Sequence, residues 1–196
     1  FGGNIEAGAA VTLGASSKVG GNITAGAAAS LGMDTRVSGN VTAGDAATLG
    51  ATSAIGTNAN YIMVEGNLKA GAVVLLGAKS VVTGNVTSGA ATPIALGDSA
   101  EVRGYAKAGT GLTLGADATV GFNPDPNEPN LNYGLAGTGP IELGDRAQVA
   151  GDATAGTSIT LAPGASIGGT CPLYTSDAAD ETDLVERACT TVTAPR

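Results

Sequence analysis

A unit of 18 residues that recurs along residues 3–168 constrains the fold of this chain more than any other feature. One complete copy, GNITAGAAASLGMDTRVS, begins at Gly21, and the next copy begins at Gly39 with GNVT. The units start at Gly3, Gly21, Gly39, Gly66, Gly84, Gly104, about Asn132, and Gly151. A repeat of this length predicts a solenoid, in which each copy forms one coil and neighbouring coils stack on each other.

Apolar residues recur at fixed positions within the unit and form three columns. The most regular column contains Leu13, Leu31, Leu49, Leu76, Leu96, Leu114, Leu143 and Leu161. A second column contains Val19, Val37, Ile55, Val82, Val102, Val120, Val149 and Ile167. A third column lies near the start of the unit and contains Ile5, Ile23, Val41, Leu68 and Val86, with the smaller residues Ala106 and Ala153 in later units.

The spacing inside each unit predicts strands. Apolar residues come in pairs two positions apart, as Ala29 and Leu31 do, which places both side chains on one face of a strand. Glycine follows the first two pairs, where a chain that turns a corner needs conformational freedom. We therefore predict an all-β fold, a triangular parallel β-solenoid of about eight coils with three short strands per coil. Residues 1–168 form this solenoid, with insertions at 57–65 and 122–131, and residues 169–196 form a C-terminal cap or docking segment.

The composition excludes several classes of function. The chain has no histidine, so the usual Ser–His and Cys–His catalytic pairs are impossible. Its formal net charge of −8 argues against binding to nucleic-acid phosphates. No apolar run is long enough to span a membrane as a helix. We expect a protein that is not an enzyme, with no catalytic residues and no cofactor.

A six-residue beat runs under the 18-residue unit, as in AGAAVT, LGASSK and VGGNIT. It resembles the hexapeptide repeat of left-handed β-helix proteins, and this resemblance implies the architecture only, because the acyltransferases and γ-class carbonic anhydrases of that kind depend on histidine. The columns G-[ND]-[IV]-x-A, V-x-L-G and x-V-x-G also resemble those of the bactofilins, a family of polymer-forming, cytoskeletal β-solenoids with right-handed coils. The handedness of the coils in this chain stays open.

The two cysteines indicate an exported protein. Cys171 and Cys189 both lie in the short segment outside the repeat, which favours a disulfide between them. The chain begins with Phe1, which we interpret as the N-terminus left after removal of a signal peptide. Both features favour an extracellular or cell-surface location, unlike that of the cytoskeletal bactofilins.

Several polar residues are candidates for structural or binding roles. One asparagine column is predicted to form a hydrogen-bonded ladder along a corner, and it contains Asn4, Asn22, Asn40, Asn67 and Asn85. Asp125, Asn127 and Glu128 offer oxygen atoms of the kind that calcium prefers, but their spacing matches no calcium motif. A turn stiffened by the neighbouring prolines is the favoured interpretation of that loop, so we expect no metal site.

We expect the chain to associate with itself end to end, in an extracellular filament or surface polymer. A first coil with bare strand edges and apolar columns invites another copy to stack on it. The predicted partner contacts are Phe1, Tyr61, Phe122, Tyr133, Thr191 and Val192. The alternative is a monomeric solenoid that binds ice or glycans, or an adhesin, because rows of Thr such as Thr24 and Thr42 face outward. Glu6, Lys69 and Lys107 interrupt that row, which disfavours ice binding.

Overall fold

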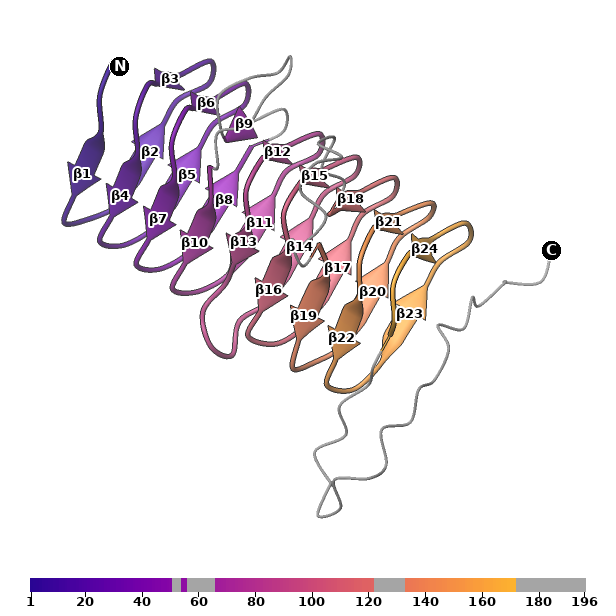
Figure 1. Ribbon diagram of the computed structural model, residues 1–196. Coiled ribbons are helices and arrows are strands. Elements are labelled where there is room, and N and C mark those ends of the chain that lie inside the picture. The colour runs from indigo at the N-terminus through magenta and orange to yellow at the C-terminus, as the bar shows by residue number, and fades with distance from the viewer. Residues whose placement is uncertain (51–53, 56–65, 122–132, 172–196) are drawn as a thin grey trace.

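The computed structural model describes residues 1–50, 54–55, 66–121 and 133–171, which form a single solenoid of stacked coils (Figure 1). Within these ranges the chain forms 24 strands of two or three residues each and no helix. Every strand pairs in parallel with the equivalent strand of the next coil. The predicted all-β parallel β-solenoid of about eight coils is confirmed.

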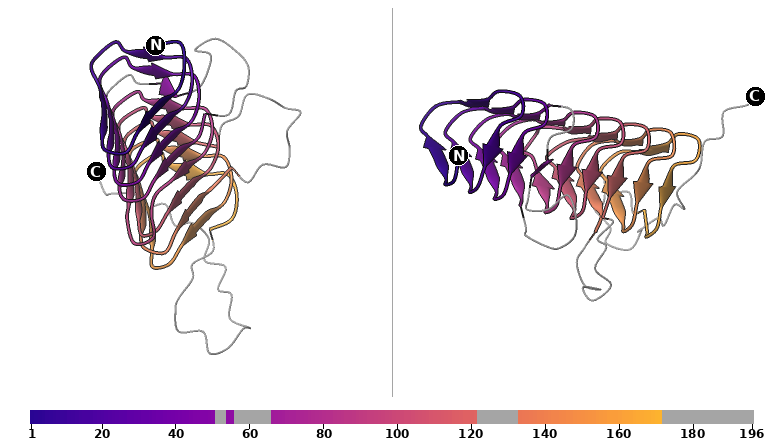
Figure 2. Two further views of the ribbon diagram at one scale, coloured as in Figure 1. Left: turned by 90° about the vertical axis from the view of Figure 1, so that its left-hand side faces the viewer. Right: turned by 90° about the horizontal axis from the view of Figure 1, so that it is seen from above.

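The strands form three sheets, one on each side of the coil (Figure 2). The first sheet contains β1 (Ile5–Ala7), β4 (Ile23–Ala25), β7 (Val41–Ala43), β10 (Leu68–Ala70), β13 (Val86–Thr87), β16 (Ala106–Ala108), β19 (Leu135–Gly137) and β22 (Ala153–Ala155). The second sheet contains β2 (Val11–Leu13), β5 (Ala29–Leu31), β8 (Ala47–Leu49), β11 (Val74–Leu76), β14 (Ile94–Leu96), β17 (Leu112–Leu114), β20 (Ile141–Leu143) and β23 (Ile159–Leu161). The third sheet contains β3 (Lys18–Val19), β6 (Arg36–Val37), β9 (Ala54–Ile55), β12 (Val81–Val82), β15 (Glu101–Val102), β18 (Thr119–Val120), β21 (Gln148–Val149) and β24 (Ser166–Ile167).

The register of the sheets follows the columns of the sequence. Ile5 pairs with Ile23 in the first sheet, and Leu13 pairs with Leu31 in the second. The register continues across both insertions, because β7 pairs with β10 and β16 pairs with β19. The strands that follow each insertion therefore keep the register of the strands before it.

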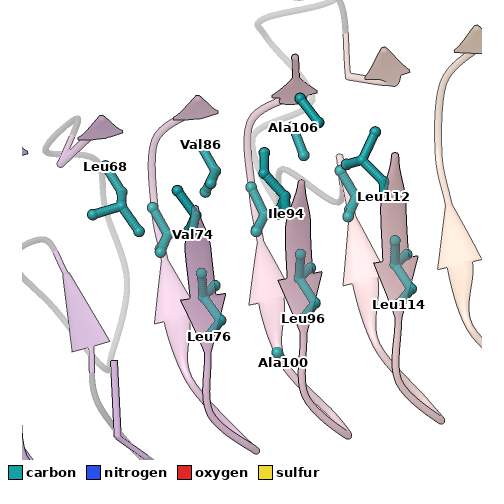
Figure 3. Close-up of a cluster of buried hydrophobic side chains, with 14 of the residues drawn as sticks. Leu68, Val74, Leu76, Val86, Ile94, Leu96, Ala100, Ala106, Leu112 and Leu114 are labelled. Atoms are coloured by element: carbon teal, nitrogen blue, oxygen red, sulfur yellow. The ribbon is translucent and has the colours of Figure 1, made fainter. Parts of the chain in front are cut away.

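The core is a narrow channel between the three sheets, filled by aliphatic side chains and alanine. Leu68, Ile94 and Leu112 are among its largest fully buried side chains, and Figure 3 shows such side chains from successive coils stacked on one another. Within the described ranges, the burial of this core is incomplete at the terminal coils. There, core residues equivalent to buried ones elsewhere are partly exposed: Ile5, Ala7, Leu13, Ile159 and Ile167.

The corner between the second and third sheets imposes a left-handed backbone. Non-glycine residues with positive φ recur there at equivalent positions: Ser16, Asp34, Lys79, Ser99, Asp117 and Arg146, with φ between 54° and 59°. The eighth coil places Gly164 at this position, with φ 74°. Glycine is the residue that takes this conformation at least steric cost, so the six coils with a non-glycine residue here carry a backbone strain that the last coil avoids.

Candidate functional site

An asparagine ladder runs along the corner that precedes the first sheet. The backbone N–H of Asn22 donates to Oδ1 of Asn4 at 2.8 Å, and the same bond joins Asn40 to Asn22, Asn67 to Asn40, and Asn85 to Asn67. The last Asn accepts from the backbone N–H of Tyr105 at 3.0 Å. Each side chain thus satisfies an amide of the next coil, which is a structural role.

The ladder is interrupted in the sixth and seventh coils. Tyr105 and Gly134 occupy the asparagine position there. In the eighth coil Asp152 takes it, and its Oδ1 accepts hydrogen bonds from the backbone N–H of Thr170 at 2.7 Å and from Thr170 Oγ1 at 3.0 Å. The side-chain acceptor at this corner is therefore missing in two coils and returns in the eighth, as a carboxylate in place of an amide.

The outward column of the first sheet changes in the same coils. Lys107, Ala136 and Thr154 pair across β16, β19 and β22 at the position that holds Thr24 and Thr42 near the N-terminus. The interruption at Lys107 was predicted from the sequence, whereas Ala136 was not, because the preceding insertion hides the start of the seventh unit. The structure places Tyr133 and Gly134 at the Gly–Asn position of that coil.

These two altered columns line an open groove on the outer face of the first sheet, with a volume of about 360 Å³. Its polar and aromatic lining residues are Tyr105, Lys107, Asp152 and Thr154, and Gly134 and Ala136 lie between them. Three strands from three coils thus bring together an aromatic ring, an ammonium group, a carboxylate and a hydroxyl. We call this site the coil 6–8 groove.

The N-terminal end face of the solenoid exposes apolar and backbone groups. The backbone N–H of Ile5 donates to the carbonyl of Asn22 at 2.8 Å, toward the second coil. Because amide direction alternates along a strand, the N–H and C=O of Glu6 point away from that coil, at the edge of the first sheet. β1 is the terminal strand of its sheet, so these two groups form an open edge.

Phe1 extends the third sheet at this end. Its carbonyl accepts a hydrogen bond from the backbone N–H of Gly20 at 2.7 Å, and its amino group donates to the carbonyl of Lys18 at 2.8 Å. The pairing places Phe1 one coil before Val19 in the second apolar column. Its side chain is nevertheless 80% exposed, so an aromatic ring stands at the open end of the core.

At the opposite end, residues 169–171 begin a further coil beside β22. The backbone N–H of Ala153 donates to the carbonyl of Thr170 at 2.9 Å. Cys171 thereby continues the column of Ile23 and Val41 and is buried, with 8% of its surface exposed. Cys189 lies outside the described residues, so the disulfide stays a prediction, as does the role of residues 172–196 as a cap or docking segment.

The remaining predicted site residues are divided between the described and undescribed parts of the chain. Tyr133 is half-buried at the start of the seventh coil. The others lie outside the described residues: Tyr61, Phe122, Asp125, Asn127, Glu128, Thr191 and Val192. Across the described ranges, no group of three or more His, Cys, Asp or Glu side chains has an arrangement that would hold a metal ion. The same ranges contain no helix with the length and hydropathy that a membrane crossing requires.

An ion pair clamps the sixth and seventh coils on the side of the left-handed corner. Arg146 donates from Nε to Oδ1 of Asp117 at 2.7 Å and from a terminal nitrogen to Oδ2 at 2.6 Å. The hydrogen bond from Arg146 is the main reason why the pKa of Asp117 lies below its ordinary value of 3.8, and the same bond raises the pKa of Arg146. Both side chains are exposed, so this pair is a modest, salt-sensitive link between coils.

Comparison with known proteins adds no family to this picture: no protein-family model, curated protein or solved structure matches the chain. The architecture is therefore established by the stacked strands alone. Two features of the solenoid remain as candidate functional sites, its end faces and the coil 6–8 groove.

Proposed function

We propose that this chain is an exported structural protein that associates end to end into an extracellular filament or surface polymer. The observation that carries the proposal is the partial exposure of Ile5, Ala7 and Leu13, whose equivalents Ile23, Ala25 and Leu31 are buried between two neighbouring coils. A second copy stacked on the first coil would bury them in the same way. Burial of apolar surface is the main driving force for such association.

The strand edges support the same arrangement. Parallel pairing already joins every coil to the next, so a second copy can continue the three sheets with the pairing that the fold itself uses. Phe1 adds to the third sheet at one end, and Thr170 and Cys171 add to the first sheet at the other. These additions lie on different sides of the coil, so both fit on one level between two stacked copies without overlap.

The cysteines and the sequence columns add to the proposal. A disulfide between Cys171 and Cys189 would return the C-terminal segment to the last coil, where it would dock on the next subunit. Such a bond persists in an oxidising environment, of which the extracellular space is one. The similarity of the columns to those of bactofilins is in keeping with a solenoid that polymerises. We propose no enzymatic activity.

The open edge of β1 offers a direct test. Glu6→Pro removes the N–H at that edge, whereas the bond from Ile5 to the second coil is retained, because proline is tolerated on edge strands. We expect the wild-type chain to form larger species as its concentration rises in sedimentation velocity experiments, and the Glu6→Pro variant to stay monomeric. Glu6→Thr, which restores the residue found at Thr24 and Thr42, is the matched control and should assemble.

Two results would contradict the proposal. One is a wild-type chain that remains monomeric over the whole concentration range. The other is a Glu6→Pro variant that assembles as the wild type does while circular dichroism shows the same β content. Ice binding is not supported as an alternative, because Thr24 and Thr42 are flanked in register by Glu6 and Lys69, which break the regular hydroxyl surface.

A further inference from the structure

We propose that the coil 6–8 groove binds a pyranose sugar residue. The inference concerns the side of the solenoid and is independent of end-to-end assembly. It starts from the joint change of two columns of the repeat in the sixth and seventh coils, and from the open volume of about 360 Å³ beside these coils.

The geometry of the groove follows from the sheet. Neighbouring strands lie about 4.8 Å apart, so β16 and β22 are separated by about 10 Å with β19 between them. Gly134 and Ala136 on the middle coil have little or no side chain and form the floor. Tyr105 and Lys107 stand on one side of this floor, and Asp152 and Thr154 stand on the other. The space left above Gly134 and Ala136 in the seventh coil is wide enough for a six-membered ring.

The chemistry of the walls matches a sugar better than other small ligands. Tyr105 is 37% exposed, and its ring offers an apolar face to the C–H face of a pyranose. Asp152 accepts hydrogen bonds, Lys107 donates them, and Thr154 does both, which suits a ligand covered with hydroxyl groups. The opposite charges of Lys107 and Asp152 balance, and the chain as a whole is acidic, so a polyanion is disfavoured.

The packing of the coils accounts for Gly134, because a Cβ there would clash with the carbonyl oxygen of Asp152, but it does not account for Tyr105 and Ala136. Asn at the ladder position gives each coil a hydrogen bond to the next, as it does from Asn4 to Asn85. Tyr105 and Gly134 give up that side-chain acceptor, and Ala136 gives up an outward side chain that favours strand structure. The substitutions weaken the stack at this point, and what they create is the groove.

The test uses the 196-residue chain and, as probes, the methyl glycosides of glucose, galactose and N-acetylglucosamine, with binding measured by saturation-transfer NMR and titration calorimetry. We expect at least one to bind with a Kd on the order of 1 mM, as one shallow site allows. Ala136→Thr and Tyr105→Asn restore the residues of the repeat. Both should therefore keep or raise the thermal midpoint while they weaken binding by about tenfold or more.

Two further variants separate a binding role from a structural one. Asp152→Asn removes the charge but supplies an amide oxygen that can accept the same hydrogen bond from Thr170, so it should weaken sugar binding without lowering the thermal midpoint. Lys69→Thr changes the same column outside the groove and should leave binding unchanged. The affinity for linear oligomers of the bound sugar should then be compared with that for the methyl glycoside. Tighter binding of the oligomers would mean that the natural ligand is a glycan chain, and equal binding would mean that it is a free sugar.

Two results would overturn the inference. One is the absence of binding by all three glycosides, and the other is unaltered binding by Ala136→Thr. Neither result bears on assembly, which the Glu6→Pro variant tests separately.

Discussion

At the residue scale, the polar side chains of this solenoid act mainly between coils. The asparagine ladder was predictable, because five Asn residues recur in one column and a stacked repeat brings them together. The continuation of the ladder by Asp152 was not predicted. A carboxylate accepts the same bond from Thr170 as an amide does, but a search for asparagine alone passes over it.

The pair of Asp117 and Arg146 gives stability a defined dependence on pH. The pKa of Asp117 is lowered in the folded chain, so its contribution is fully present above the unfolded value near 3.8 and is lost as the pH falls through the folded value. We expect Asp117→Asn to lower the thermal midpoint slightly at neutral pH. The difference from the wild type should shrink as the solution is acidified below about pH 4, and should also shrink in high salt.

Thermal midpoints of the two proteins, measured as a function of pH, check this prediction. An Asp117→Asn difference that stays constant from neutral to strongly acidic solution would show that the ion pair is not its cause. Asp98→Asn is a useful comparison in the preceding coil, because the oxygen of Asp98 accepts from the backbone N–H of Ala116, and an amide oxygen can replace it.

At the element scale, each strand is too short to be stable alone, and stability comes from the stacking of coils. We therefore expect the cost of a core truncation to depend on the position of its coil. Leu49 is 1% exposed between two neighbours, so Leu49→Ala should lower the free energy of unfolding by about 2–5 kcal/mol. Leu13 lies in the same column of the terminal coil and is only partly buried, so Leu13→Ala should cost less in the dilute monomer.

Urea denaturation of the two variants at low protein concentration measures this difference. Equal losses would mean that the first coil is already covered, contrary to the open end face proposed above. In the assembled state, the loss for Leu13→Ala should approach that for Leu49→Ala, because a stacked neighbour would bury both side chains.

The strands and their register could be predicted from the sequence, whereas the groove could not. Columns such as Leu13, Leu31 and Leu49 carry the register directly, because residues 18 apart in the sequence lie side by side. The groove depends on Tyr105, Gly134 and Asp152, and an insertion separates the first two by 29 residues. Its floor consists of Gly134 and Ala136, and small residues of this kind are common throughout the repeat, so their positions do not stand out in the sequence.

At the scale of the whole molecule, the chain is a rod whose two ends differ from its middle in one respect. The middle coils have neighbours on both sides. The first coil has a neighbouring coil on one side, the eighth coil is partly covered by residues 169–171, and both keep partly exposed core residues. A solenoid of this kind gains the most apolar burial by adding another copy along its own axis. The rod geometry therefore connects the repeat to the proposed filament.

Negative-stain electron microscopy of the purified chain is the most direct test of that claim. About eight coils at about 4.8 Å each, plus one level shared between copies, give an expected axial repeat of about 40–45 Å. Filaments with this repeat would support end-to-end stacking. Isolated short rods at every concentration, or filaments whose repeat differs clearly from the length of the rod, would contradict it.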